Sequence, residues 1–318
     1  MPLRPEIRDY ILARCESIPF AELKAACAAL SAHYRSGQPS STAGLPPQAR
    51  TAAYLLTRFP ATYSAAEAVM RQLRRGLPEQ DLTSCLDLGA GAGSATLAAR
   101  SVFPSLAEFS LIDSSPEMRE AARELIPEAC FPAADLRSHA SYPEHDLVVA
   151  AYVLGELAAG ERAAVLARAW RSARRALALI EPGSPDGFAL IREARTWLLE
   201  SGAQMLAPCP GGGPCPMEAP DWCHFAARLE RTSLHRRMKD AALGYEDEKF
   251  SYVVFSRRET PCAAARIIRR PEHSPGVVRI VTCSGGRIER RLISRRSPAF
   301  RAARQARWGD PWTGPDES

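Results

Sequence analysis

The chain lacks a long apolar run, and it contains almost no lysine. None of its 318 residues lies in an uninterrupted hydrophobic stretch long enough to cross a bilayer, so we expect no transmembrane helix and no membrane partner. The first residues, MPLRPE, lack the apolar segment of a secretory signal peptide, so a cytoplasmic location is the default expectation. Lysine occurs three times among 41 basic residues, and arginine therefore supplies nearly all the positive charge.

The positive charge is concentrated near the C-terminal end. The segment from Arg257 to Trp308 holds 14 arginines and three acidic residues, a net charge of +11 in a chain whose total is +5. A basic block beside a mildly acidic remainder is typical of nucleic-acid binding. The alternative is a solvated surface on which arginine reflects codon preference alone.

Nine cysteines in a chain without a signal peptide argue against a disulfide framework and for metal ligands or scattered core thiols. Three of them fall in a loop rich in Gly and Pro, residues 208–225, with the spacing C-x5-C-x7-C. Such a loop cannot pack on itself, so a bound metal would supply the missing core, and thiolates suit zinc or an iron–sulfur cluster. The predicted metal ligands in this loop are Cys209, Cys215 and Cys223.

The spacing leaves the fourth ligand open. The candidates are His224, Cys262 and Cys283. His224 adjoins Cys223, which makes it an awkward ligand for the same metal, whereas Cys283 ends a predicted strand that would present its side chain rigidly. Free buried thiols are the alternative to a metal site.

A glycine-rich turn between a predicted strand and a predicted helix is the motif from which a nucleotide site is predicted. Residues 84–93 read SCLDLGAGAG, and residues 94–100 continue as the first turns of a helix. A strand, a glycine loop and a helix in this order form a nucleotide site, because glycine permits a sharp turn and a close backbone approach to the ligand. The expected ligand contacts in the loop are Gly89, Gly91 and Gly93.

Polar residues at strand ends complete this site. Asp87 stands where a carboxylate meets the amino-acid part of a ligand, and Asp113 follows the next strand at the distance from the glycines at which an acid binds a ribose. Asp135 lies at the usual place for recognising an adenine amine. Tyr152, after the fourth strand, either stacks on a base or adenine or fills the core. Because the carboxyl ends of parallel strands share one edge, we expect these residues and Glu181 around one cleft.

The run LDLGAGAG, with the acid of the following LID, resembles the class I S-adenosylmethionine-dependent methyltransferases. S-adenosylmethionine is therefore the expected cofactor, and a glycine loop in a nucleotide-free α/β domain is the alternative. Methyltransferases that act on the amino group of a base resemble one another in an N/D-P-P-Y/F/W tetrad after the fourth strand, whereas residues 150–156 here read AAYVLGE. No cysteine follows the fourth or fifth strand as a C5-cytosine nucleophile would, so the catalytic residues are unknown; Glu156 is a candidate, with solvation or capping as the alternative.

The predicted elements fall into three parts. Residues 1–80 read as helices, and Ser64 is a predicted N-cap in a capping box with Glu67, after a break at Pro60. Residues 81–257 alternate strands with helices, which predicts an α/β fold with a parallel, doubly wound sheet. The predicted helices are 7–18, 21–34, 49–59, 64–75, 92–103, 116–125, 159–174 and 226–237. The predicted strands of this sheet are 84–88, 108–112, 146–151, 176–181 and 252–256.

Residues 258–318 are predicted to form a small basic β module. Its strands are expected at 265–268, 277–282 and 287–293, with arginine on the exposed face. The predicted phosphate-binding stripe on a following short helix consists of Arg301, Arg304 and Arg307. Residues 36–47 are expected to form a flexible loop, and residues 313–318 to be disordered.

The chain as a whole resembles a more specific family. The segments 150–157 and 181–188, the C-P-x4-C-P loop, WCHF at 222–225 and RWGD at 307–310 are similar to the methyltransferase-like family associated with the small ribosomal subunit in bacteria and mitochondria. The resemblance runs from the N-terminal helices to Trp308. It implies a class I methyltransferase (Rossmann-like) fold and a role in assembling the small subunit on its rRNA, with ribosomal proteins as possible further partners.

The resemblance also implies a [4Fe–4S] cluster carried by four cysteines. Its ligands would be Cys209, Cys215, Cys223 and Cys283, with Cys262 the less favoured choice for the fourth. Zinc is the alternative metal, which would make the chain a zinc-containing nucleic-acid methyltransferase. Two functions of different class are therefore hypotheses. One is an rRNA methyltransferase. The other is a non-catalytic rRNA-binding assembly factor, whose bound cofactor stabilises the folded state. The arginine block and the cysteine loop argue against a small-molecule methyltransferase.

Overall fold

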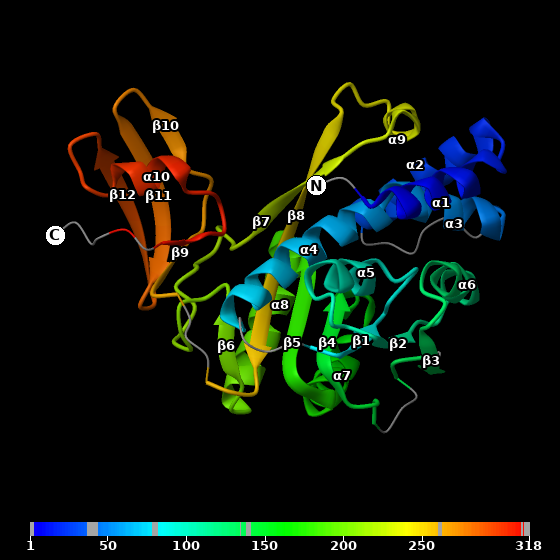
Figure 1. Ribbon diagram of the computed structural model, residues 1–318, viewed down its shortest axis with the longest axis horizontal. Helices are drawn as coiled ribbons and strands as arrows, with labels where there is room; N and C mark the ends of the chain where they lie inside the picture. The colour runs from blue at the N-terminus through cyan, green and yellow to red at the C-terminus, as the bar shows by residue number, and fades with distance from the viewer. Residues whose placement is uncertain are drawn as a thin grey trace.

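The structure, a computed structural model, describes residues 3–36, 44–77, 82–133, 135–137, 141–259, 263–312 and 314. Within these ranges the main body is built on an eight-stranded sheet with the strand order β3-β2-β1-β4-β5-β8-β6, and β7 pairs with β8 beside this path (Figure 1). Its strands are β1 (Ser84–Leu88), β2 (Glu108–Ile112), β3 (Cys130–Ala133), β4 (His145–Ala151), β5 (Ala173–Pro182), β6 (Gln204–Ala207), β7 (Phe225–Glu230) and β8 (Tyr245–Ser256).

The sheet is parallel on one side and antiparallel on the other. Strands β1 to β5 run parallel to one another, whereas β8 is antiparallel to β5, β6 and β7. Strands β1 and β4 are buried along their whole length, which explains why their sequences are apolar without alternation. The predicted α/β class I methyltransferase fold is confirmed, but the expectation of a wholly parallel sheet is corrected by β8.

Helices cover both faces of the sheet. Val149 and Ile180 point into the layer formed by α4, α5 and α6, whereas Val148 and Leu179 point into the layer formed by α7 and α8. This alternation is the period of two that a strand imposes on its side chains. The helices are α1 (Pro5–Glu16), α2 (Phe20–Ser36), α3 (Pro47–Thr57), α4 (Phe59–Gly76), α5 (Ser94–Val102), α6 (Pro116–Leu125), α7 (Ala159–Ser172) and α8 (Pro185–Glu200), with a short 3-10 turn η2 (Leu154–Glu156) after β4.

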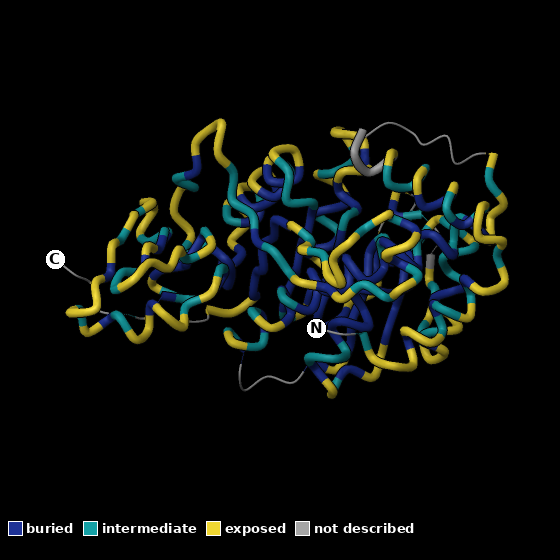
Figure 2. The backbone as a smooth tube through the Cα atoms, turned by 90° about the horizontal axis from the view of Figure 1, so that it is seen from above, coloured by how far each residue is buried: buried dark blue, intermediate teal, exposed yellow. Residues whose placement is uncertain are grey.

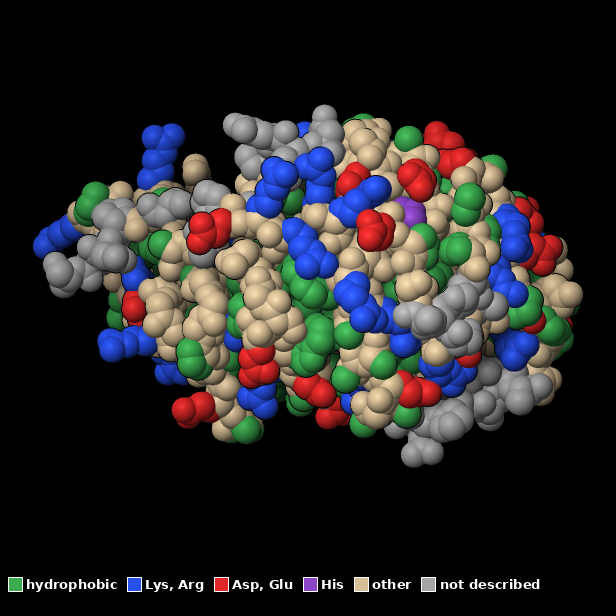
Figure 3. Space-filling view, turned by 90° about the horizontal axis from the view of Figure 1, so that it is seen from below, with side chains coloured by type: hydrophobic (Ala, Val, Ile, Leu, Met, Phe, Trp, Pro, Cys, Tyr) green, Lys and Arg blue, Asp and Glu red, His purple; other side chains and the backbone are tan. Residues whose placement is uncertain are grey.

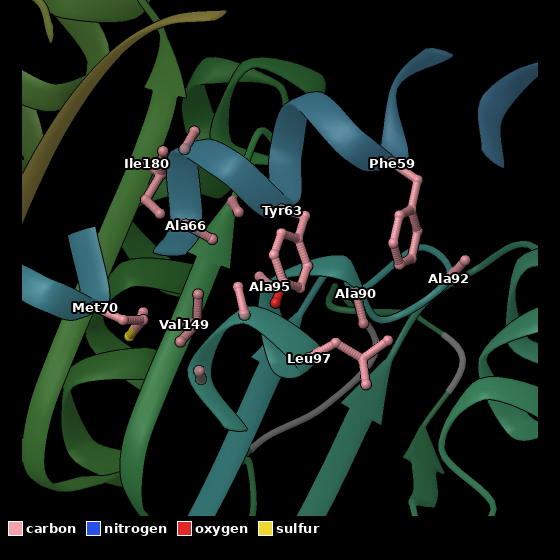
Figure 4. Packing of buried hydrophobic residues seen from close by; sticks show 14 of the residues in the cluster. Phe59, Tyr63, Ala66, Met70, Ala90, Ala92, Ala95, Leu97, Val149 and Ile180 are labelled. Atoms are coloured by element: carbon pink, nitrogen blue, oxygen red, sulfur yellow. The ribbon is translucent and has the colours of Figure 1, made fainter. Parts of the chain in front are cut away.

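Helix α4 attaches the N-terminal helices to the sheet. Its side chains Phe59, Tyr63 and Met70 are fully or almost fully buried, and they face α5, Ala90 of the glycine loop and Val149 of β4 (Figure 4). Helices α1, α2 and α3 pack beyond α4, near the carboxyl ends of the strands (Figure 1). The apolar face of α4 is therefore part of the same core as the sheet.

The C-terminal part forms a second sheet beside the main body. In the described residues it has five strands, β9 (Ala265–Ile267), β10 (Glu272–Ser274), β11 (Val277–Ser284), β12 (Arg287–Ser294) and β13 (Pro311–Trp312), covered by α10 (Phe300–Gln305). Its small core includes Ile267, Ile280 and Trp312. Much of its backbone is exposed, in contrast to the buried strands of the main body (Figure 2). The second sheet lies inside the predicted range 258–318, and the boundaries at residues 80 and 257 stay a prediction.

The start of α4 differs from its prediction. Pro60 does not separate two helices but occupies the first turn of α4, where its missing amide hydrogen removes no helical hydrogen bond. Ser64 is not a cap, because it lies inside α4 with 6% of its surface exposed, and Glu67 pairs with Arg71 at 3.0 Å. The capping signal is local, whereas the burial of the whole α4 face decides where the helix begins.

Three other predictions are wrong or incomplete. Residues 226–237 are not one helix, because Phe225–Glu230 pairs with β8 as β7 and only Ser233–Met238 is helical, as α9. Arg307 lies beyond the end of α10, so the predicted stripe of three arginines on one helix is wrong. Helix α8 and strands β3 and β6 have no counterpart among the predicted elements. Pairing across a sheet explains these errors, since it depends on residues distant in sequence.

Some predictions fall on residues outside the described ranges. Most of the loop at 36–47 and of the tail at 313–318 is among them, as is Cys262. No helix in the described part of the chain is long and apolar enough to span a membrane.

Shortening a side chain on the buried face of α4 tests this architecture. Met70→Ala should lower the free energy of unfolding by about 2–5 kcal/mol, because Met70 is fully buried and the substitution leaves a cavity. Arg71→Lys, one residue further on the exposed side, keeps a positive charge beside Glu67 and should change it by no more than about 0.5 kcal/mol. Urea unfolding followed by circular dichroism measures both, and equal effects of the two substitutions would contradict the packing of α4.

Candidate functional site

The glycine loop leaves β1 in a conformation that requires glycine. Gly89 and Gly91 have φ angles of 68° and 54°, in the left-handed region that other residues avoid. A Cβ atom on Gly89 would lie 2.4 Å from a Val153 methyl group, and one on Gly91 would lie 2.7 Å from the Tyr54 hydroxyl. The amides of Gly89 and Ala90 donate to the Ile112 carbonyl at 2.8 and 3.0 Å. The loop is thus held by the end of β2 and covered by α3.

A cavity of about 580 Å³ opens at this loop, and we call it the cofactor cavity. Its floor is formed by the carboxyl ends of the strands and its other wall by α3 and the start of α4. Among its lining residues are five of the predicted contacts: Gly89, Gly91, Asp113, Asp135 and Tyr152. Lining residues that the sequence did not indicate include Arg50, Tyr54, Arg58 and Thr62. No motif marks these four, because they reach the cavity only through the packing of α3 and α4.

Asp113 connects the glycine loop to the end of β2. Its Oδ2 accepts a hydrogen bond from the Gly91 amide at 2.7 Å, and its Oδ1 accepts one from the Ser115 amide at 2.8 Å. Burial raises the pKa of Asp113, while these amides and Arg119 oppose the rise. Asp135 forms a fork-like ion pair with Arg137, at 2.8 Å for its shortest contact. Both carboxylates therefore border the cofactor cavity with defined orientations.

Asp87, near the end of β1, and Gly93, in the glycine loop, do not line the cofactor cavity. Asp87 is buried beneath the loop, where its Oδ2 accepts hydrogen bonds from the Thr96 amide and hydroxyl at 3.1 and 2.7 Å. Burial raises the pKa of Asp87 to about 7, against the lowering effect of the two Thr96 hydrogen bonds. Its Oδ1 has no hydrogen-bond partner among the described residues. The geometry gives Asp87 a bracing position, and its predicted contact with a cofactor stays a prediction.

Tyr152 ends β4 with a φ of 58°, which is unusual for a bulky residue. Its hydroxyl donates to Glu248 Oε1 at 3.0 Å, and Arg58 Nη2 lies 3.4 Å from the same oxygen. Burial, and then the negative charge of Glu248, raise the pKa of Tyr152 well above its usual value. The hydroxyl is therefore a fixed hydrogen-bond donor rather than an acid or base for catalysis.

Glu181 was expected at the cleft but is buried behind it, with 1% of its surface exposed. Its Oε1 accepts hydrogen bonds from the amides of Val153 and Leu154 at 3.1 and 2.8 Å. Burial raises the pKa of Glu181 to about 7, and these amides oppose the rise. Glu181 thus holds the turn after β4 in place.

Four cysteines line a second, small cavity of about 60 Å³, which we call the cysteine cavity. They are the four predicted metal ligands, Cys209, Cys215, Cys223 and Cys283. The first three come from the loop after β6, and Cys283 comes from β11 of the second sheet. Ser251 of β8 fixes this loop by donating to the Cys223 carbonyl at 2.8 Å. The structure therefore brings together residues that are up to 74 positions apart in the chain.

The thiols face one another without converging on a point. In the described residues no group of three or more His, Cys, Asp or Glu side chains is arranged to hold a metal ion. Burial, and then the neighbouring thiols, raise the pKa of Cys223 well above its usual value and that of Cys283 to about 11. His224 does not line the cysteine cavity. Its ring instead stacks on Trp222 at 5.2 Å and meets the edge of Trp308 at 5.0 Å.

With both cavities defined, the chain can be compared with known proteins. Residues 48–313 match the family described as mitochondrial small ribosomal subunit Rsm22. The chain belongs to the Rsm22 family. The matched region contains the glycine loop and all four cysteines of the cysteine cavity.

This Rsm22-family chain spans only part of the length of two curated relatives. It is 26% identical over 286 residues to the human mitochondrial ribosome assembly protein METTL17, covering 81% of the chain and 61% of the relative. It is 27% identical over 327 aligned residues to the Rsm22-cox11 tandem protein 2 of Schizosaccharomyces pombe, covering 81% of the chain and 42% of that relative. The predicted cytoplasmic location is wrong, because these relatives are mitochondrial proteins and point to the mitochondrion. Among solved structures, the magnesium protoporphyrin IX methyltransferase of Synechocystis PCC 6803 with bound S-adenosylmethionine is 17% identical with a TM-score of 0.39, covering 62% of this chain and 80% of that one.

The buried carboxyl beneath the glycine loop should make stability depend on pH. The pKa of Asp87 is about 7 in the folded protein and about 4 in an unfolded chain, so the folded state binds more protons between these values. The free energy of unfolding should therefore fall as the pH rises from about 4 to about 7. Asp87→Asn should reduce this fall, by on the order of 2–4 kcal/mol.

The control is Asp146→Asn. The pKa of Asp146 is lowered by its hydrogen bonds to Thr83 and by Arg174 and Arg175, although burial opposes this, so this substitution should remove stability that is present above pH 4 and lost on acidification. Urea unfolding between pH 2 and pH 8 measures both variants without ligand. If the free energy of unfolding changed with pH in the same way for wild type and Asp87→Asn, the raised pKa of the buried Asp87 would be contradicted.

Proposed function

We propose that this Rsm22-family chain is an assembly factor of the small ribosomal subunit that binds S-adenosylmethionine in the cofactor cavity. The observation that carries the proposal is the glycine loop, with Asp113 bonded to its Gly91 amide, at the wall of a cavity of about 580 Å³. The backbone at Gly89 and Gly91 leaves room for close approach of a ligand. In this proposal, Asp113 accepts hydrogen bonds from ribose hydroxyls, and Asp135 accepts one from an adenine amine. The bound cofactor would supply a sulfonium methyl group and binding energy for the fold.

The end of β4 favours a non-catalytic role for the cofactor. Tyr152, where base-modifying enzymes place a residue that grips the base, has its hydroxyl engaged by Glu248 near Arg58. The amides that follow Tyr152 are bonded to Glu181. These contacts restrain the segment that would have to accept and activate a base, so we propose that the cofactor acts mainly as a structural ligand.

One feature supports rRNA methylation as a second candidate function. The cofactor cavity extends from the glycine loop to α3, where Arg50 and Thr51 line it, and to the start of α4, where Thr62 lines it. A cationic and hydroxyl-rich wall opposite the methyl donor suits a phosphate or a nucleoside acceptor.

The proposed partner is small-subunit rRNA, with ribosomal proteins as possible further partners. Six arginines on or near β12 and α10 are exposed: Arg287, Arg290, Arg295, Arg296, Arg301 and Arg304. Cationic side chains also form a band across the underside of the main body, with acidic side chains between them (Figure 3). Exposed guanidinium groups bind phosphates through paired hydrogen bonds, so both regions suit an RNA backbone.

We also propose that the cysteine cavity holds a [4Fe–4S] cluster. The donor set fits, because four thiols line one enclosed space and four cysteine thiolates are the usual ligand set of this cluster. Zinc, which four thiolates also bind, is the alternative.

Substituting Asp113 tests the cofactor site. Asp113→Asn should weaken S-adenosylmethionine binding about tenfold or more, because a carboxylate that accepts hydrogen bonds contributes about 1.5–3 kcal/mol. Isothermal titration calorimetry measures the affinity. The control is Asp247→Asn, since Asp247 pairs with Arg228 on β7 and does not line the cofactor cavity. Equal affinities for wild type and Asp113→Asn would contradict the site.

A methyl-transfer assay separates the two functions. Wild-type protein, labelled S-adenosylmethionine and immature small subunits should give no label in rRNA if the cofactor is structural, while Asp113→Asn should still impair assembly in cells. Label in rRNA that Asp113→Asn abolishes would establish the methyltransferase instead.

Metal content tests the cysteine cavity. Anaerobically purified wild type should contain iron and sulfide in equal amounts, and Cys283→Ser should lose most of both because one of four ligands is removed. Cys130→Ser is the control, since Cys130 is an exposed thiol on β3. Stoichiometric zinc without sulfide would replace the cluster with zinc, and full iron content with an unchanged absorbance spectrum in Cys283→Ser would contradict Cys283 as a ligand.

A further inference from the structure

Two arginines are buried in the wall of the cysteine cavity. Arg195 of α8 and Arg266 of β9 line it, with 6% and 4% of their surface exposed. Arginine is almost never buried to this extent unless it is paired. Apart from these two guanidinium groups, Arg192 at the rim and Tyr252, the wall consists of cysteine, apolar, Gly and Pro side chains.

The partners of the two guanidinium groups are neutral. Arg195 Nη2 donates to the Gly213 carbonyl, and its Nε has no hydrogen-bond partner among the described residues. Arg266 Nε donates to the Pro208 carbonyl at 2.8 Å, and its Nη1 donates to Gln72 Oε1 and to the Gly309 carbonyl at 2.7 and 3.0 Å. In the chain as described, neither arginine has a carboxylate within 4.0 Å.

These two positive charges lie in the wall of the same cavity that the four thiols line. Carbonyl hydrogen bonds do not neutralise a buried guanidinium group, and a buried charge without a counter-charge is strongly destabilising. An anion in the cysteine cavity would remove that cost for both arginines together.

We infer that Arg195 and Arg266 are the built-in counter-cations of an anionic, thiolate-ligated metal centre in the cysteine cavity. The inference rests on the proposed metal site. Four thiolates around an oxidised [4Fe–4S] core carry a net charge of about −2, which two arginines balance. A zinc ion with four thiolates carries the same charge, so both metals share the chemistry.

Two consequences follow from this charge balance. The arginines destabilise the metal-free protein and stabilise the loaded one, so replacing one with a neutral residue has opposite effects on the two forms. In a cluster, one-electron reduction adds a negative charge that the arginines stabilise, so they raise the reduction potential. An arginine that only holds the loop in shape would stabilise both forms alike and leave the potential unchanged.

The test compares Arg195→Met and Arg195→Lys with a matched control, Arg192→Met. Lysine keeps the charge and methionine keeps only the bulk. Arg192 lies on the same helix one turn earlier, over the Phe188 ring at 5.6 Å and at the rim of the cavity. Full-length variants are purified anaerobically and assayed loaded and metal-free, by thermal unfolding, by loss of iron to a chelator, and by redox titration with dithionite followed by absorbance.

Arg195→Met should lose iron about tenfold faster or more than wild type, and its potential should become more negative. Its loaded form should melt at a lower temperature, and its metal-free form at the same or a higher temperature. Arg195→Lys and Arg192→Met should stay near wild type, and the pair Arg266→Met and Arg266→Lys repeats the comparison if Arg195→Met does not fold. Equal destabilisation of both forms with an unchanged potential would overturn the inference.

Failure of the proposed metal site gives a different result. Wild-type protein without iron, sulfide or zinc would refute the metal centre itself, and the counter-cation inference with it. Protein with zinc alone has no redox signal, but the opposite shifts of the loaded and metal-free forms still decide the role of the arginines.

Discussion

Strand β8 fixes the positions of both cavities relative to the main sheet. Its first residues alternate between exposed and partly buried in the pairing with β7, and its last seven are all buried. Glu248 in the first half holds the Tyr152 hydroxyl at the cofactor cavity. Three residues later, Ser251 holds the loop of the cysteine cavity, and Tyr252 and Val253 line it. Because a strand in the middle of a sheet cannot shift by one residue without turning its apolar side chains to the wrong face, both cavities keep a fixed relation to the sheet.

The loop that carries Cys209, Cys215 and Cys223 lies between β6 and β7 of the main sheet. Cys283 and Arg266, which line the same cavity, belong to the second sheet. A loop of this composition has little apolar surface of its own, and its packing partners Phe188, Met217 and Ile268 form only a small cluster. The apolar contact at this loop is therefore small, and the thiols and the two arginines lie beside it.

The sequence was informative where the signal is local. The strand, glycine loop and helix around residue 89 were predicted because glycine spacing and apolar runs are properties of neighbouring residues, and the four cysteines could be grouped from composition and resemblance. The wall formed by Arg50, Tyr54 and Arg58 could not be predicted, because it depends on how α3 packs. Likewise, Arg195 and Arg266 look like any other arginine in the sequence, and only their burial sets them apart. Local patterns also misplaced the start of α4 and the β7 strand, where tertiary pairing overrides propensity.

The two cavities draw on different lengths of the chain as it is synthesised. The residues that line the cofactor cavity come from residues 30–157, whereas Glu181 and Glu248, which hold the turn after β4 and the Tyr152 hydroxyl, come later in the chain. The cysteine cavity needs residues from Phe188 to Gly286, including a strand of the second sheet. Since synthesis runs from the N-terminus, the residues that line the cofactor cavity emerge before those that line the cysteine cavity. The order of the residues along the chain thus sets the order in which the walls of the two cavities become available for folding.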